Sequence, residues 1–196
     1  MNPKKTGEQL LRESNVTYEM YADMPEDGKR YEVADGQLEL MSPVPTPFHQ
    51  LISNELQLIL NSSCRNDYII FSAPLDVIFS DREVRQPDLL MIHRSRLSIV
   101  GKRGINGAPD LVVEIMSDHS RRRDKLHKTK AYAKYGVPEY WIIDMTSSTL
   151  EQYSLHGAVY ELIELYAEEE AIRSDKFPCV SFSMRQLMQE IPDLPD

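Results

Sequence analysis

The length, composition and charge of the chain exclude several classes of protein. The chain has 196 residues and a mass of 22.6 kDa, which suits one domain with a substantial core. Hydrophobic residues make up 41% and charged residues 27%, and no apolar stretch approaches the roughly 20 residues that a membrane-spanning helix needs. The N-terminus lacks the apolar core of a secretory signal. We therefore expect a cytoplasmic protein with no membrane partner.

The charge is unevenly distributed along the chain. The net charge of −9 disfavours non-specific binding to phosphate backbones. Residues 121–134, however, hold seven Lys or Arg against one Asp, whereas residues 161–170 hold five Glu and no basic residue. The sequence thus predicts an acidic protein with one basic stripe.

The two cysteines, Cys64 and Cys179, do not indicate a disulfide framework or a zinc site. Two are too few for a framework, and they lack the paired spacing of zinc ligands. We expect both to be buried or half-buried thiols.

The N-terminal third predicts a hairpin and then a helix. Residues 1–30 show little periodicity and favour an extended arm or a short helix. Alternating runs at 30–33 and 37–41 flank Asp35-Gly36, a strong hairpin signal. The proline-rich segment 42–47 predicts a stiff loop. Apolar residues then recur at helical spacing over 48–61.

The middle of the chain predicts strands and a crossover helix. Residues 68–79 favour a long strand broken or bent at Pro74, and 85–92 its hairpin partner. A strand at 109–116, a helix at 120–135 and a strand at 139–144 favour a parallel pair with a right-handed crossover.

The C-terminal part predicts an appended hairpin. Its strands are expected at 150–153 and 159–165, and a short terminal helix follows residues 177–182. The element order indicates a single α/β domain over 1–196, with a mixed sheet flanked by helices and added N-terminal and C-terminal hairpins. The core would span about 30–145 and the C-terminal extension 146–196.

Asp88 and Glu114 are the candidate catalytic carboxylates. Glu114 lies in the apolar run 111–116, where a buried carboxylate is costly unless a cation compensates it. Side chains alternate between the two faces of a strand, so Asp88 and Glu114 each project from one face of their strand. If the two strands are neighbours, the two carboxylates can lie close together. Two close carboxylates suit Mg²⁺, with Mn²⁺ as a substitute. The alternatives are an arginine partner such as Arg122 for Glu114 and a turn-forming role for Asp88.

Several strings resemble the Uma-type family of bacterial proteins, a branch of the PD-(D/E)XK restriction-endonuclease-like superfamily. The resemblance runs in order from about residue 30 to 145, with a weaker match at 176–178. The strings are YEVADG (31–36), MSP (41–43), QPDLL (86–90), PDLVVEI (109–115), RRRD (121–124), Tyr132 and GVPEYW (136–141). The resemblance implies a restriction-endonuclease-like fold and Mg²⁺-dependent cleavage of phosphodiester bonds.

The resemblance also implies roles for individual residues. Asp88 and Glu114 match the two acidic motif positions, so both would bind the metal, with the backbone carbonyl of Ile115 as third protein ligand. The lysine of the motif is replaced by Met116. Lys128 on the next helix matches a recurrent lysine, and Lys125 and Lys130 compete for that role.

Other residues are weaker candidates. Asp124 either pairs with Lys128 on a solvated helix face or positions it at the site. Arg121, Arg122 and Arg123 form either a solvated cluster or a contact for the phosphate backbone. His49 and Glu32 could join the site from the first helix and the first hairpin. Asp110, which also follows a proline, favours a turn at a strand entry.

The sequence therefore predicts an endonuclease that acts on nucleic acid, with DNA as the expected substrate and a homodimer as the expected assembly. The alternative is a non-catalytic module that binds nucleic acid or serves assembly, which Met116 and the acidic charge favour. A hydrolase of a small phosphate ester is the third hypothesis.

Overall fold

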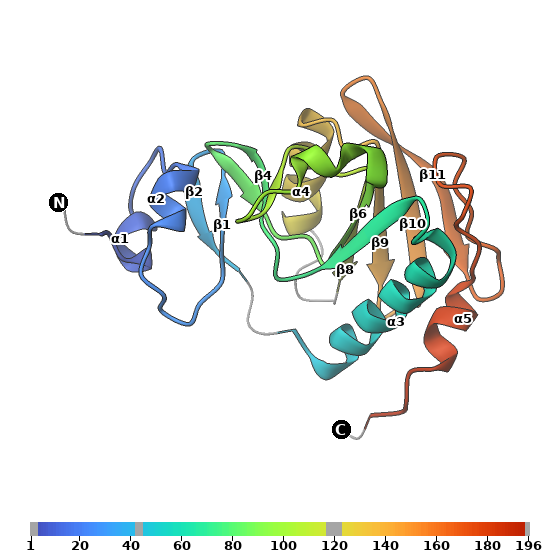
Figure 1. Cartoon of the computed structure of the whole chain (residues 1–196). Coiled ribbons are helices and arrows are strands. Elements are labelled where there is room, and N and C mark those ends of the chain that lie inside the picture. Colours follow the sequence, from blue (N-terminus) through green and yellow to red (C-terminus); the bar gives the residue numbers. More distant parts are fainter. Residues whose placement is uncertain (1–3, 42–44, 117–122, 195–196) are drawn as a thin grey trace.

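Two mixed β-sheets lie side by side, with helices on both faces of the larger one (Figure 1). The computed structural model describes residues 4–41, 45–116 and 123–194, and for residues 123–125 the backbone only. Sheet A has the order β2-β1-β5-β4-β7, and sheet B the order β11-β10-β9-β8-β6-β3. The strands of sheet A are β1 (Tyr31–Ala34), β2 (Gln37–Leu40), β4 (Val77–Ser80), β5 (Glu83–Arg85) and β7 (Ile105–Asn106). Those of sheet B are β3 (Tyr68–Ser72), β6 (Leu89–His93), β8 (Leu111–Met116), β9 (Glu139–Asp144), β10 (Thr149–His156) and β11 (Val159–Ala167).

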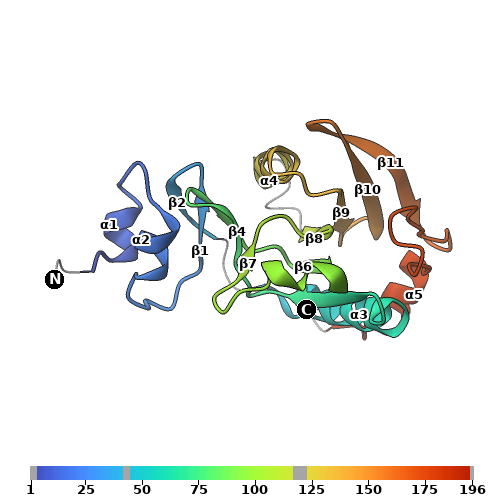
Figure 2. The same cartoon turned by 45° about the horizontal axis from the view of Figure 1, so that its top comes forward.

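The helices cover both faces of sheet B and one end of sheet A. They are α1 (Gly7–Leu10), α2 (Tyr18–Ala22), α3 (Pro47–Cys64), the 3₁₀ segment η1 (Arg94–Ile99), α4 (Arg123–Lys134) and α5 (Met184–Gln189). Figure 2 shows sheet B between α4 on one side and α3 with α5 on the other. The short helices α1 and α2 lie beside β1 and β2, where the sequence favoured an arm or one short helix.

The locally encoded predictions are confirmed. β1 and β2 pair antiparallel across Asp35-Gly36, and both turn residues have positive φ, as a type I′ hairpin turn requires. The helix expected at 48–61 is α3, which begins at Pro47 with Thr46 as its N-cap. β8 and β9 are parallel and joined through α4, which ends before Gly136 at φ 78°. The C-terminal hairpin is β10 and β11.

The two strands of the predicted central hairpin each divide between the sheets. β3 pairs with β6 in sheet B, and β4 pairs with β5 in sheet A. The divisions fall at Pro74 and Pro87, because proline has no N–H to donate to a sheet ladder. This arrangement carries the chain from sheet A into sheet B immediately before Asp88.

Alternation along β8 separates two hydrophobic cores. Leu111, Val113 and Ile115 pack in the core that includes α3 and α5. Val112 and Met116 pack in the core that includes Tyr132 of α4. Glu114 shares the parity of Val112 and Met116, so its side chain lies on the α4 face of sheet B.

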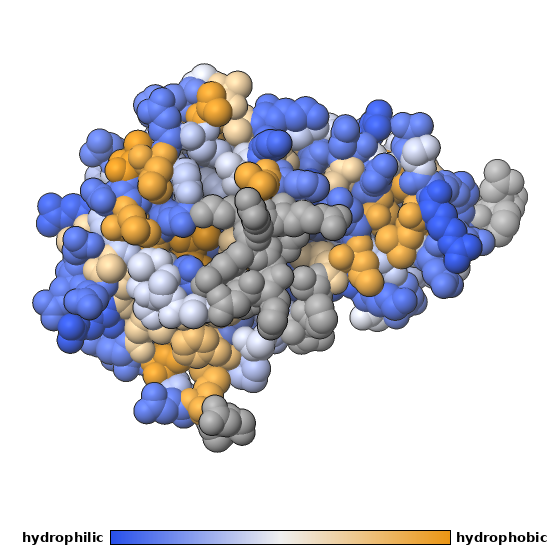
Figure 3. Space-filling view, turned by 180° about the vertical axis from the view of Figure 1, so that it is seen from behind, coloured by the Kyte–Doolittle hydropathy of each residue, from blue (hydrophilic) through white to orange (hydrophobic). Residues whose placement is uncertain are grey.

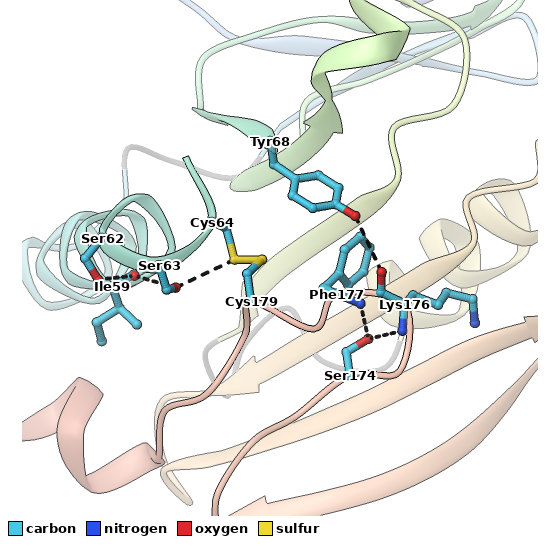
Figure 4. The surroundings of a disulfide bond; sticks show 9 residues. All are labelled: Ile59, Ser62, Ser63, Cys64, Tyr68, Ser174, Lys176, Phe177 and Cys179. Atoms are coloured by element: carbon cyan, nitrogen blue, oxygen red, sulfur yellow. Dashed lines mark hydrogen bonds between the residues drawn. A yellow bond between two sulfur atoms is a disulfide. The ribbon is translucent and has the colours of Figure 1, made fainter. Parts of the chain in front are cut away.

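The prediction of two free thiols is wrong, because Cys64 and Cys179 form a disulfide. The bond joins the last residue of α3 to the segment before α5 (Figure 4). Around it, the Tyr68 hydroxyl donates to the carbonyl of Lys176, and the Tyr68 and Phe177 rings meet edge to face. The two cysteines are 115 residues apart, so only the tertiary fold brings them together.

Removal of this disulfide should lower stability. A crosslink across so long a loop restricts the unfolded chain, so Cys64→Ser with Cys179→Ser should lower the free energy of unfolding by about 2–4 kcal/mol. Denaturant titration measures this loss, and a reductant should reproduce it in the wild type. A free-thiol titration that finds two reactive cysteines in the unfolded, unreduced protein would contradict the pairing.

Among the described residues, no helix is long and apolar enough to cross a bilayer. On the face shown in Figure 3, hydrophobic residues form small groups separated by hydrophilic ones. The exposed apolar residues of β11 are Val159, Leu162, Ile163 and Leu165.

Candidate active site

Asp88 and Glu114 meet where β6 begins beside β8. The two strands pair antiparallel with Leu89 opposite Val113, so Asp88 falls opposite Glu114 when this register is extended by one residue. The backbone N–H of Ile115 donates to Asp88 Oδ2 over 2.7 Å, in place of a strand partner. Because the N–H and C=O of one strand residue point to the same side, the carbonyl of Ile115 lies on the edge that faces Asp88.

Lys128 and Tyr132 of α4 bind the carboxylate of Glu114. Lys128 Nζ lies 2.9 Å from both oxygens of Glu114, and the Tyr132 hydroxyl donates to Oε1 over 2.6 Å. The two residues are four apart, so they share one face of the helix. Glu114 is 5% exposed. This carboxylate is therefore buried and partnered by an ammonium and a hydroxyl.

Glu32 connects this cluster to sheet A. Its Oε1 lies 3.5 Å from Lys128 Nζ and accepts the backbone N–H of Gln86 over 2.8 Å. Its Oε2 lies 3.1 Å from Arg85, whose guanidinium also binds Glu83 over 2.7 Å. Lys128 thus bridges carboxylates of the two sheets, Glu32 of β1 and Glu114 of β8.

His49 reaches the cluster from the first turn of α3. Its Nε2 lies 3.2 Å from Asp88 Oδ2. Burial disfavours the imidazolium, but hydrogen bonding to Asp88 and the charges of Asp88 and Glu114 outweigh it and raise the pKa of His49. His49 Nδ1 is buried and has no hydrogen-bond partner among the described residues.

The surroundings of the cluster raise the pKa of both Glu114 and Lys128. Burial first, and then the charges of Asp88 and Glu32, raise the pKa of Glu114 to about 7 in spite of Lys128. Burial disfavours the ammonium of Lys128, but the charges of Glu114, Glu32 and Asp88 raise its pKa above the usual range. Lys128 therefore stays protonated, and Glu114 titrates near neutral pH.

The donor set fits a divalent metal. Two carboxylates and one backbone carbonyl are hard oxygen ligands, and Mg²⁺ commonly completes such a shell with water and substrate oxygens. No group of three or more His, Cys, Asp or Glu side chains suited to a metal occurs among the described residues. Asp88, Glu114 and the carbonyl of Ile115 are the candidate ligands, because the antiparallel register of β6 and β8 brings them together.

The structure brings together Asp88, Glu114, Lys128, Glu32 and His49, five of the residues that the sequence singled out. The competing lysine Lys130 is exposed. Arg121 and Arg122 lie outside the described residues, as do the side chains of Arg123, Asp124 and Lys125.

Asp110 has the structural role expected of a strand-entry residue. Its Oδ2 accepts the backbone N–H of His93 over 2.7 Å, and its Oδ1 binds Arg96 over 2.5 Å. It is therefore engaged away from the Glu114 cluster.

Sequence reasoning missed Tyr132 and Arg85 as members of the site. The spacing of Tyr132 from Lys128 could have revealed it, because residues four apart on a helix reach the same neighbour. Arg85 had no local signal. Its role depends on the pairing of β1 with β5, which brings it to Glu32.

Comparisons with known proteins identify the family and the fold of the chain. The Uma2 family model, described as "Putative restriction endonuclease", matches residues 18–185. A solved structure described as a "putative nuclease belonging to DUF820", from Anabaena variabilis ATCC 29413, superposes with a TM-score of 0.71 at 22% sequence identity. The match covers 89% of this chain and 98% of the other, and the likeness establishes the shared fold. A search of curated proteins finds no match.

Proposed function

The chain belongs to the Uma2 family, and we propose that it is a Mg²⁺-dependent nuclease that hydrolyses phosphodiester bonds of nucleic acid, with DNA as its substrate. One observation carries the proposal. Lys128 Nζ lies 2.9 Å from both oxygens of Glu114, in the cluster that includes Asp88. The chain has Met116 two residues after Glu114, and Lys128 supplies the missing ammonium from α4.

Each residue of the cluster has a definite task in this proposal. Asp88, Glu114 and the carbonyl of Ile115 hold the metal, which when bound polarises the phosphate and lowers the pKa of water. Lys128 orients the attacking water or stabilises negative charge on the phosphate. Glu32, itself held by Arg85, positions Lys128. His49 holds the Asp88 carboxylate in place through Oδ2.

The remaining assignments concern the substrate and assembly. Arg121, Arg122 and Arg123 follow β8 in the sequence after four intervening residues and are proposed to contact the phosphate backbone, with Asp124 near Lys128. A homodimer would present two such sites to two strands. Light scattering coupled to size-exclusion chromatography tests the dimer.

Nucleic-acid cleavage tests the proposed function. Supercoiled plasmid, single-stranded DNA and RNA are each incubated with wild type and Glu114→Gln, with Mg²⁺, Mn²⁺ or EDTA. We expect metal-dependent cleavage of DNA by wild type that EDTA and the substitution remove. Absence of cleavage under all conditions would favour the non-catalytic module.

Metal affinity should depend on pH through Glu114. A proton on Glu114 competes with the metal, and the pKa of this carboxyl is about 7. Affinity should therefore rise as pH increases through 7 and level off above it, with Mg²⁺ binding at pH 6 about tenfold weaker than at pH 8. Isothermal titration calorimetry at these two values measures the difference. Equal affinity at both would show that Glu114 is not a ligand that titrates in this range.

A further inference from the structure

A second concave site lies between α2 and the segment that links β3 to β4. The cleft has a volume of about 610 Å³, within the range of small-ligand sites. The lining residues that matter here are Tyr18, Tyr21, Arg30, Asp76, Gln86 and Arg103. None of them belongs to the Glu114 cluster.

A hydrogen-bond network centred on the Gln86 side chain fixes one wall of the cleft. Its Nε2 donates to Asp76 Oδ1 over 2.8 Å and to the Tyr21 hydroxyl over 3.1 Å. Its Oε1 accepts from Arg30 Nη2 over 3.0 Å, and the Tyr21 hydroxyl donates to Asp76 Oδ1 over 3.1 Å. A carboxylate and a guanidinium thus flank one amide. Asp76 Oδ2 has no hydrogen-bond partner among the described residues and can accept from a ligand.

The lining suits a nucleobase better than a phosphate backbone. Its basic residues, Lys29, Arg30 and Arg103, are matched by the acidic Glu26, Asp27 and Asp76, so the cleft has no net attraction for an anion. The half-buried rings of Tyr18 and Tyr21 offer surfaces for stacking. Asp76 and Arg30 offer an acceptor and a donor for the polar edge of a base.

The cleft is adjacent to the candidate active site. The backbone N–H of Gln86 donates to Glu32, which contacts Lys128. Gln86 also precedes Asp88 by two residues in the chain, so their Cα atoms are at most about 7 Å apart. The wall of the cleft is therefore linked to the Glu114 cluster both by a hydrogen bond and along the chain.

We propose that this cleft binds one unstacked nucleobase of the strand whose phosphate lies at Asp88 and Glu114, and thereby selects the sequence beside the cleaved bond. The proposal rests on the proposed nuclease function. The base stacks on Tyr18 and donates an N–H to Asp76.

Sequencing of cleavage ends tests the selection. Randomised single-stranded DNA is cleaved by wild type, Tyr18→Leu, Asp76→Asn and the control Arg185→Ala, which alters an exposed arginine of α5. Wild type and the control should show about a tenfold base preference at one position near the cut, and both cleft variants should lose it. No preference in wild type, or one unchanged in both cleft variants, would overturn the proposal.

A binding measurement separates the cleft from the nuclease. Saturation-transfer NMR with the four deoxynucleoside 5′-monophosphates should detect base protons on wild type and Asp88→Asn, and lose them with Tyr18→Leu. Thermal melts establish that each variant folds. If base protons are detected in this pattern but wild type cleaves no nucleic acid, the proposed nuclease function is wrong and the proposed base site stands. Cleavage by wild type without base contact overturns the base site alone.

Discussion

Replacement of Lys128 by methionine is expected to lower the rate of metal-dependent cleavage by roughly 10²–10⁴-fold. Methionine keeps an unbranched side chain but removes the ammonium that contacts both oxygens of Glu114. The loss should appear in single-turnover rates at saturating DNA, because the ammonium acts on the water or on the phosphate. Lys130→Met is the matched control, since Lys130 is exposed on the same helix.

The same substitution should destabilise the fold. Without Lys128, Glu114 loses its ammonium partner, and Glu32 keeps Arg85 and the backbone N–H of Gln86. This loss should cost roughly 3–5 kcal/mol at pH 8. The cost should shrink at acid pH, where Glu114 takes up a proton, and Mg²⁺ should stabilise the variant more than wild type. If Lys128→Met cleaves DNA at the wild-type rate, Lys128 has no role in catalysis.

Replacement of Asp88 by asparagine should reduce cleavage at least roughly 100-fold. Loss of a residue that only supports a metal ligand typically costs 10–100-fold, and loss of a direct ligand should cost more. Asparagine keeps the shape of the side chain, and its amide oxygen can still accept the N–H of Ile115. The initial rate of plasmid cleavage at fixed Mg²⁺ measures the effect.

Asp110→Asn provides a closely matched control for Asp88→Asn. Both aspartates follow a proline at the entry to a strand of sheet B, but Asp110 binds Arg96 and the N–H of His93. We expect cleavage within about twofold of wild type and a loss of about 1–2 kcal/mol in stability. Equal loss of activity in the two variants would show that Asp88 acts through the fold.

The parts of the fold that the sequence predicted are those encoded by local patterns. The Asp35-Gly36 turn, the apolar spacing within α3 and the glycine after α4 each act within a few residues. The parallel β8–β9 pair followed from the helix between the strands. Division of the central hairpin between two sheets could not be predicted from local patterns. A proline indicates that a strand breaks or bends, but it does not indicate which sheet the chain joins next.

The site was predictable to a similar extent. Asp88 and Glu114 stood out because a carboxylate in an apolar strand is costly, and Lys128 followed from the family resemblance. The partnership of Glu32 with Arg85 depends on the pairing of distant strands. The Cys64–Cys179 bond was missed for the same reason, since no local spacing relates two residues that meet through the packing of α3 beside the C-terminal segment.

Calorimetric titration of wild type and Asp88→Asn with Mn²⁺ at pH 8 tests most directly whether Asp88 and Glu114 hold a divalent metal. We predict one site per chain in wild type, binding at least roughly 100-fold weaker in Asp88→Asn, and wild-type binding in the Asp110→Asn control. Absence of binding to wild type, or equal binding by wild type and Asp88→Asn, would contradict the metal site.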